Sequence, residues 1–162
     1  MPNPKSMFGI TTKMDLSGLK KLEKESPEIF QKAQEKAGLQ FLTWCNTGST
    51  NTSKKPPIRY GVLRGSSTVF VGNKLVSIYE IPIRSGSKES PSPLRSYSGK
   101  PGTITIVYNT DYAHRMHEHR GGWGQYTLQD HDAGAKWLEE HLEKDRNDLM
   151  ELIAEFVKGE LE

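Results

Sequence analysis

Residues 112–120, YAHRMHEHR, place three histidines, one glutamate and two arginines in nine positions. His114, His117 and Glu118 occupy positions i, i+3 and i+4, so a helix would put their side chains on one face. Imidazole and carboxylate groups in such an arrangement can bind zinc. The chain also contains His131 and His141 as candidate ligands. A zinc site is therefore the first chemistry to compare with the rest of the sequence.

The surrounding sequence argues against a metal site. The H-E-x-x-H pattern is absent, and no cysteine stands among the histidines. If the preceding strand continues to Tyr112, the backbone is extended, and Glu118 points away from His117 and His119. We therefore interpret the histidines as polar contacts where a strand ends and turns toward GGWG. We predict no metal and no cofactor.

The patterns of nucleophilic catalysis and phosphate binding are missing as well. Cys45 follows Trp44 on an apolar helical face, where a thiol typically behaves as a small hydrophobe. The stretch RGSS at 64–67 is not a G-x-S-x-G elbow, and GKPGT at 99–103 lacks the spacing and the following helix of a nucleotide site. The sequence predicts a protein that is not an enzyme.

Basic side chains gather in the middle of the chain, with Tyr60 and Tyr97 among them. Such a set could contact DNA phosphates without sequence preference, or contact neighbouring subunits. It matches no helix-turn-helix, finger or aromatic-platform pattern. The candidate contact residues are Lys54, Lys55, Arg59, Arg84, Lys88, Arg95 and Lys100, with Arg64 in the same region.

The charges are distributed unevenly, although the net charge is only +2. Residues 46–101 carry nine Lys/Arg and two Glu, a balance of +7, whereas residues 128–162 carry four Lys/Arg and eleven Asp/Glu, a balance of −7. The two regions can attract each other within one chain or between neighbouring copies. The alternative is that they are simply basic loops and an acidic solvent-facing helix.

Length and composition indicate a single domain, residues 1–162, with a modest core and long polar loops. Hydrophobic residues make up 34% of the chain, and the mean hydropathy is −0.67. The single Cys45 excludes an internal disulfide and fits a reducing compartment. No signal-peptide core is visible at the N-terminus, and the apolar runs are too short to span a membrane. We expect a cytosolic product with no membrane partner.

Two helical stretches are predicted within residues 15–45. In DLSGLKKLEKE, leucines recur every three residues. Ser26 and Pro27 then fit the N-cap and first position of a second helix. That second stretch places Phe41 and Trp44 on one apolar face, where they are expected to be core residues.

Short strands are predicted in the middle of the chain. STVFVG and LVSIYEIPIR flank a turn at 72–73, which indicates a hairpin whose second strand ends near Pro82. TITIVYN alternates, so it predicts a half-buried strand with Ile104, Ile106 and Tyr108 on one face.

Polar connections surround these strands. Residues 46–59 and 85–101 are predicted to be flexible loops, the second because its Ser, Pro and Gly content offers little surface to bury.

The C-terminal part predicts one long helix from Ala133 to Leu161, about 28 residues and about 40 Å long. Its apolar stripe is interrupted around Asp145 and Arg146. With helices first, strands next and a long helix last, the sequence indicates an α+β fold. We expect a small antiparallel sheet packed by N-terminal helices and a long C-terminal helix, with long flexible loops. The stripe consists of Leu138, Leu142, Leu149, Ile153, Phe156 and Leu161.

Three short motifs follow one another in PPIRYGVLRGS, VYNTDYAHRMHEH and GAKWLEEHLEK. Together they resemble the tail-component family of long-tailed bacteriophages, which includes minor capsid, tail-completion and neck proteins. The first motif departs from the family pattern at Tyr60, where threonine is usual. The matching residues are Gly61, Leu63, Arg64 and Ser66, then Tyr112, Ala113, His117 and Glu118, then Lys136, Trp137 and Leu138.

The resemblance implies a structural virion protein without catalysis, located in the neck after assembly in the host cytoplasm. Its expected role is a ring-forming subunit of the head-tail connector that completes the tail or joins it to the head. The expected partners are further copies in a ring, the connector or stopper, the tail terminator, and DNA passing through the lumen. A tail terminator and a basic, non-specific DNA-binding protein are the alternatives.

The resemblance also implies structural or interface roles for five residues. Arg64 and Glu118 carry opposite charges in two of the motifs, and we expect an ion pair between them. Tyr112 and Trp123 are expected packing anchors, and Trp137 marks the entry into the last helix.

Overall fold

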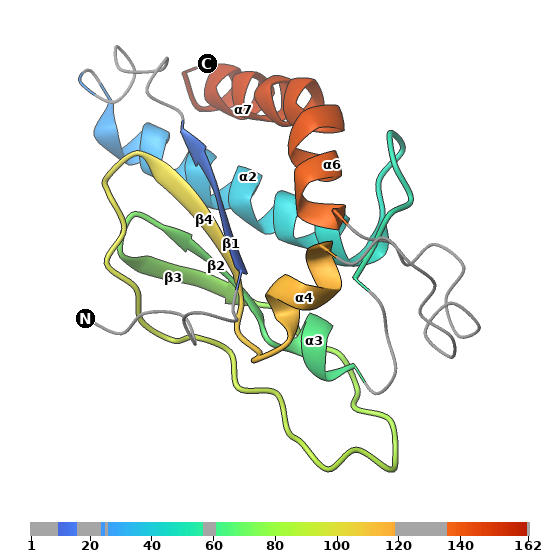
Figure 1. The fold of residues 1–162 in the computed structure, drawn as a ribbon. Helices are drawn as coiled ribbons and strands as arrows, with labels where there is room; N and C mark the ends of the chain where they lie inside the picture. Colours follow the sequence, from blue (N-terminus) through green and yellow to red (C-terminus); the bar gives the residue numbers. More distant parts are fainter. Residues whose placement is uncertain (1–9, 16–23, 25, 57–60, 119–135, 162) are drawn as a thin grey trace.

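The computed structural model describes residues 10–15, 24, 26–56, 61–118 and 136–161, and it has the expected α+β fold (Figure 1). Four strands form one antiparallel sheet in the order β1-β4-β2-β3. The strands are β1 (Ile10–Asp15), β2 (Ser67–Val71), β3 (Lys74–Ile78) and β4 (Thr103–Tyr108). The helices are α2 (Pro27–Thr47), α3 (Val62–Gly65), α4 (Ala113–Glu118), α6 (Trp137–Lys144) and α7 (Arg146–Leu161).

Strand β1 corrects the expectation for the start of the chain. Its six residues, ITTKMD, pair with β4 from Ile10 opposite Tyr108 to Asp15 opposite Thr103. Asp15 therefore ends a strand and does not begin a helix, because isoleucine and threonine suit a pleated surface. The rest of the predicted leucine-repeat helix, residues 16–23, lies outside the described residues.

Helix α2 begins at Pro27 and follows Ser26, as the sequence predicts. It continues past Cys45 to Thr47, so the first two residues of the predicted loop 46–59 are helical. Gly48 then adopts a φ of +88°, and its N–H donates to the carbonyl of Trp44 at 2.8 Å. Glycine takes a positive φ without a Cβ penalty, so the helix ends there.

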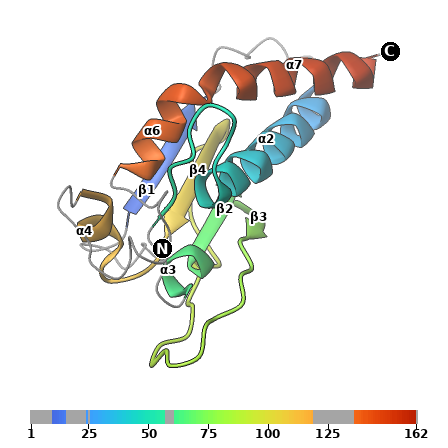
Figure 2. The ribbon, with the colours of Figure 1, turned by 90° about the vertical axis from the view of Figure 1, so that its right-hand side faces the viewer.

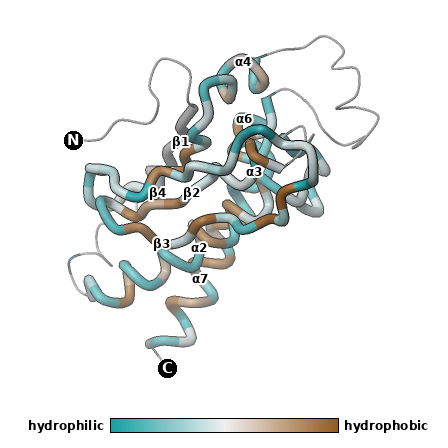
Figure 3. Tube along the Cα trace, turned by 90° about the horizontal axis from the view of Figure 1, so that it is seen from below, coloured by the Kyte–Doolittle hydropathy of each residue, from teal (hydrophilic) through white to brown (hydrophobic). Residues whose placement is uncertain are grey.

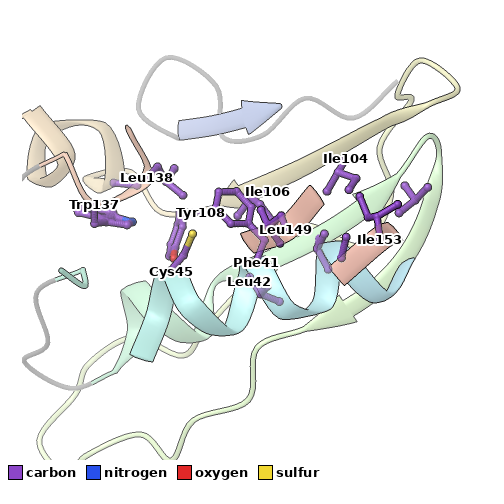
Figure 4. Close-up of a cluster of buried hydrophobic side chains, with 14 of the residues drawn as sticks. Phe41, Leu42, Cys45, Ile104, Ile106, Tyr108, Trp137, Leu138, Leu149 and Ile153 are labelled. Atoms are coloured by element: carbon purple, nitrogen blue, oxygen red, sulfur yellow. The ribbon is translucent and has the colours of Figure 1, made fainter. Parts of the chain in front are cut away.

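The main core lies between α2 and one face of the sheet. Figure 4 shows Phe41 of α2 beside Ile104, Ile106 and Tyr108 of β4, which form the predicted inward face of that strand. Gly38 allows the helix to approach closely, because a Cβ there would lie 3.0 Å from a methyl carbon of Val69. Along the chain, apolar positions are concentrated on the strands and α2 (Figure 3).

The opposite face of the sheet is covered by residues 79–102, which connect β3 to β4 and are called segment 79–102 below. Leu94 and Tyr97 pack over Phe70 and Val107, and the rings of Phe70 and Tyr97 lie 5.5 Å apart. All six residues of β4 are therefore buried, not one face alone. The prediction that residues 85–101 have too little apolar surface to bury is thus wrong, because two of their apolar residues anchor them on the sheet. That these residues are mobile stays a prediction.

The C-terminal helix is not continuous. Helix α6 ends at Lys144, α7 begins at Arg146, and Asp145 stands between them. Figure 2 shows the two helices at a wide angle to one another. The interruption in the apolar stripe thus marks a change of direction, and Ala133 lies outside the described residues. Within the described part of the chain, no helix is long and apolar enough to cross a membrane.

Candidate functional site

The second and third motifs meet beside the C-terminal end of β4. The N–H of Lys136 donates to the carbonyl of His117 at 2.7 Å, and the ammonium of Lys136 forms an ion pair with Glu118. The ring of Trp137 packs edge-on against His117, with centroids 4.9 Å apart, and against Tyr108 at 5.5 Å. These contacts hold the start of α6 on α4.

The first motif forms the turn that leads into β2. Gly61 has a φ of +99°, which glycine adopts readily. The buried Arg64 side chain then donates through Nε and Nη2 to the carbonyl of Pro56, at 3.0 and 2.7 Å. Ser66 accepts the N–H of Asn109 through its Oγ at 3.1 Å and its carbonyl at 3.3 Å. The motif thus joins the preceding loop to the end of β4.

The ion pair expected between Arg64 and Glu118 is not formed; both residues are described, and the structure gives them different partners. Arg64 is turned inward to a backbone carbonyl. Glu118 is exposed at the end of α4 and faces Lys136. The first and second motifs, which carry these opposite charges, meet through the bonds between Asn109 and Ser66 and not through this pair.

The histidine-rich stretch is helix α4, not the strand end and turn that we expected. His117 is turned into the core with its Nδ1 3.4 Å from a carboxylate oxygen of Glu118, whereas His114 is exposed, so the three side chains do not converge on one point. Among the residues the structure describes, no three His, Cys, Asp or Glu side chains form a potential metal site. His131 lies outside those residues, and His141 belongs to a different cluster.

The electrostatics at this junction favour a neutral histidine next to a charged pair. Burial lowers the pKa of His117 below its ordinary 6.5, and the neighbouring Glu118 only partly opposes this. The hydrogen bond from Lys136 lowers the pKa of Glu118, and the same contact raises the pKa of Lys136. His117 Nε2 and Trp137 Nε1 are buried and have no hydrogen-bond partner in the described part of the chain. Both rings therefore act as packing surfaces.

A second polar cluster joins loop 48–56 to the α6–α7 junction; we call it the Asp145 cluster (Ser49, Asn51, His141 and Asp145). Ser49 Oγ donates to Asp145 Oδ1 at 2.6 Å, and Asn51 Nδ2 donates to the same oxygen at 3.1 Å. Thr52 Oγ1 donates to a carboxylate oxygen of Glu140 on α6. Figure 2 shows the loop running beside α6.

His141 is fully buried between two partners. Its Nε2 lies 2.6 Å from the carbonyl oxygen of Lys54, which can only accept, so Nε2 carries a proton. Its Nδ1 lies 2.5 Å from Oδ2 of Asp145, so a second proton lies between these two atoms. His141 and Asp145 are thus a buried, proton-sharing pair, and both carboxylate oxygens of Asp145 are bonded.

The residue types of a hydrolase triad are present in this cluster, but their order differs. In a triad, histidine stands between the nucleophile and the acid and takes the proton of the nucleophile. Here Asp145 stands between Ser49 and His141, and the far nitrogen of His141 is bonded to a carbonyl. No base is therefore aimed at Ser49, and the cluster fixes backbone positions.

The buried thiol and phenol beside this cluster are also structural. Burial raises the pKa of Cys45 well above its ordinary value, and the nearby Asp145 adds to the effect, so the thiol is not activated. Burial likewise raises the pKa of Tyr108. Its hydroxyl donates to Asn46 Oδ1 at 2.8 Å, and Asn46 Nδ2 donates to Ser67 Oγ at 3.0 Å. This chain of hydrogen bonds links β4, α2 and β2.

The candidate contact residues fall into two groups. Lys54 lies 3.8 Å from Glu140, so basic and acidic regions attract each other within the chain at this point, and Lys55 is half-buried in the same loop. The second group is exposed along segment 79–102 and consists of Arg84, Lys88, Arg95 and Lys100. Tyr112 packs against the main core as a half-buried residue, whereas Arg59 and Trp123 lie outside the described residues.

Sequence reasoning missed the Asp145 cluster. Two features pointed to it: Asp145 interrupts the apolar stripe, and it stands four residues after His141, the spacing at which helical side chains meet. The partners from loop 48–56 lie more than eighty positions away in sequence, at Ser49, Asn51 and Lys54. No local pattern connects them to α6.

Comparisons with models of known protein families, with curated proteins and with solved structures found no match. The contacts among the three motifs, and the different surroundings of the two basic segments, are therefore the basis for a functional proposal.

Proposed function

We propose that this protein is a structural subunit of the head-tail connector, or neck, of a long-tailed bacteriophage. In this role it forms a ring that completes the tail or joins it to the head. The proposal rests on the resemblance of the three motifs to the tail-component family. It is supported by one observation: motif residues far apart in sequence are in contact, through Lys136 with Glu118 and Trp137 with His117. Unrelated chance matches have no reason to meet.

The chemistry of these residues supports a structural role. The Arg64 guanidinium is bonded to a carbonyl, Glu118 to Lys136, and His117 is a buried neutral ring. Groups that are occupied in this way hold segments together and are not poised to transform a substrate. The other buried polar pair, His141 and Asp145, is occupied in the same manner.

Two surfaces of opposite charge suit a head-to-tail contact between copies. Segment 79–102 presents exposed lysines and arginines, and α6 and α7 present exposed glutamates such as Glu143, Glu151 and Glu155. A contact between different surfaces of identical subunits produces a ring when the rotation closes. Complementary charge at such a contact sets the register more than the affinity.

The same exposed basic residues favour a second candidate function, non-specific binding of DNA. In a neck ring the DNA passes through the lumen, so the two functions are compatible there. A protein whose only function is to bind DNA would differ from a neck subunit in one respect. Its DNA binding would depend steeply on salt, and it would have no role in particle assembly.

Deletion of the gene in the phage that carries it tests the proposal, with the lysate examined by electron microscopy. We expect full heads beside finished but unattached tails, and rescue by the wild-type gene supplied in trans. Overlong tails would instead assign the tail-terminator role. Normal infectious particles would contradict a virion role.

A variant with Arg84, Lys88, Arg95 and Lys100 changed to glutamine tests whether the positive charge of this surface is needed for assembly, apart from any effect on folding. We expect it to fold normally and to fail in rescue. A matched control changes four exposed lysines outside segment 79–102 to glutamine, namely Lys24, Lys32, Lys36 and Lys158, and should rescue. Loss of salt-dependent DNA binding without loss of assembly would favour the second function.

A further inference from the structure

A cavity of about 270 Å³ lies at one end of the sheet, away from the three motifs. Its walls are the first turns of α2, the β2–β3 turn at Gly72 and the turn before β4 at Pro101. Figure 1 shows these three parts of the chain at the same end of the sheet. The volume is just below the range of drug-sized ligand pockets, so it suits a smaller molecule or one residue of a peptide.

The cavity contains a buried polar group without a partner. Gln34 lines it and is 1% exposed, and its Nε2 has no hydrogen-bond acceptor among the described residues. A buried amide donor without an acceptor is costly to the folded state, and such groups often mark a site that is completed by a ligand. A leucine at this position of α2 would fill similar space without that cost. The amide therefore indicates that an acceptor oxygen binds here.

Two further features favour a negatively charged acceptor. Ser26 makes no side-chain capping bond to α2, so the N–H groups of the first turn lack this acceptor, although Glu28 in the same turn partly offsets the positive end of the helix dipole. Lys74 also lines the cavity; because its ammonium is already paired with Glu35 at 2.6 Å, it contributes to anion binding only where the ligand competes with Glu35. Of the described residues that line the cavity, none is acidic.

The remaining walls are apolar or backbone. Phe30, Val71 and Pro101 supply apolar surface. Gly99 brings the backbone of segment 79–102 against the β2–β3 turn, because a Cβ on it would lie 2.2 Å from the carbonyl oxygen of Gly72. The site therefore combines donors at one side with a small apolar surface.

We propose that this cavity binds a carboxylate carried on a small apolar group, the chemistry of an apolar C-terminal residue of a polypeptide or of a small organic acid. The carboxylate accepts from Gln34 Nε2 and lies near the first turn of α2 and Lys74. The apolar group contacts Phe30 and Pro101. This site is independent of the proposed neck function.

The test is a titration of the ¹⁵N-labelled full chain followed by NMR, because the side-chain NH₂ of Gln34 gives its own signals. The ligands are N-acetyl-leucine, its C-terminal amide and acetyl-Ala-Ala-Leu. With N-acetyl-leucine we expect shifts at the Gln34 side chain, Gly72 and Gly102, and at least tenfold weaker binding of the amide. If the tripeptide binds tenfold more tightly than N-acetyl-leucine, the ligand is a polypeptide C-terminus. If the two bind equally, the ligand is a small organic acid.

Variants make the assignment specific. Gln34→Leu should abolish these shifts while the protein stays folded or becomes more stable, and Lys74→Gln should weaken binding several-fold. Lys36→Gln, on another face of α2 over the Phe156 ring, is the matched control and should bind normally. Three results would each overturn the proposal. The first is the absence of shifts at 10 mM ligand, about the weakest binding worth assigning. The others are equal binding of acid and amide, and normal binding by a folded Gln34→Leu or Lys74→Gln protein.

Discussion

Loop 48–56 and segment 79–102 are both polar, basic and outside the helices and strands, yet they are held in opposite ways. The loop is held by polar bonds to the Asp145 cluster, and its Lys54 lies near Glu140. The segment is held by the apolar side chains Leu94 and Tyr97, and its basic residues remain exposed. Similar composition therefore leads to different availability: the first basic segment meets acidic groups of its own chain, and the second presents its charges outward.

The cause of the difference is what each segment lies against. Loop 48–56 runs beside α6 and its junction with α7, where Glu140 and the buried Asp145 offer carboxylates. Segment 79–102 crosses an apolar sheet face, where Phe70 and Val107 would otherwise be open to water. Burial of apolar area needs no charged partner, so exposed basic residues of the segment such as Lys88, Arg95 and Lys100 can serve a contact with another molecule.

Removal of the central carboxylate should break the first half of this comparison. Asp145→Ala leaves the buried Nδ1 of His141 without its partner and removes the Asp145 bonds of Ser49 and Asn51, although Asn51 keeps its bond to Asp148. Loss of one member of a buried pair typically costs about 3–5 kcal/mol. We expect the free energy of unfolding, measured by urea denaturation, to fall by that amount, and amide exchange in loop 48–56 to accelerate while segment 79–102 is unchanged.

Asp148 provides the matched control, because it also accepts from Asn51, at 2.7 Å, but from an exposed position. Asp148→Ala should cost about 0.5 kcal/mol, as surface changes do. Equal losses for the two variants would mean that the Asp145 cluster does not hold the loop.

The sequence predicted the elements that depend on local patterns and missed the contacts between distant ones. Ser26 and Pro27 mark the start of α2, and the alternation of Ile104, Ile106 and Tyr108 marks an inward face, because capping and pleating act between near neighbours. The burial of the other face of β4 depends on a segment that only comes to lie on it in the folded chain.

The candidate site was predictable to a similar extent. The three motifs were found through their resemblance to the tail-component family, because each is a short run of neighbouring residues. Their mode of contact was not: His117 packs on Trp137, and Arg64 bonds Pro56 instead of Glu118. Pairing of charges cannot be derived from opposite sign alone, since it depends on the direction in which α4 turns each side chain.

Removal of an apolar anchor should break the second half of the comparison. Leu94 is 9% exposed and belongs to a small cluster with Phe70 and Val107. Leu94→Ala should lower the free energy of unfolding by about 2 kcal/mol, the lower end for a buried leucine. Limited proteolysis should then cut within segment 79–102 but not in loop 48–56. Ser96→Ala, at an exposed neighbour, is the control and should change neither measurement. If the protease cleaves Leu94→Ala no faster than Ser96→Ala, apolar contact does not hold the segment.

Two histidines, one on α6 and one packed against its first residue, repeat the contrast between polar and apolar attachment on a smaller scale. Both ring nitrogens of His141 are bonded, whereas His117 packs on Trp137 and, among the described residues, only its Nδ1 has a partner, Glu118 at 3.4 Å. His117→Phe should keep the ring contact and lose no buried hydrogen bond at Nε2, so stability at pH 7 should change by less than about 0.5 kcal/mol.

Acid should distinguish this variant from the wild type. Because burial lowers the pKa of His117 in the folded protein, the unfolded chain binds the proton first as the pH falls below 6.5. The stabilising contribution of the neutral ring is therefore complete above that pH and is lost below it, by at most about 1.4 kcal/mol per pH unit. Urea denaturation from pH 7 to pH 5 should show the wild type losing stability relative to His117→Phe. Parallel profiles would mean that the His117 site tolerates a charge, and the distinction between the two histidines would then fail.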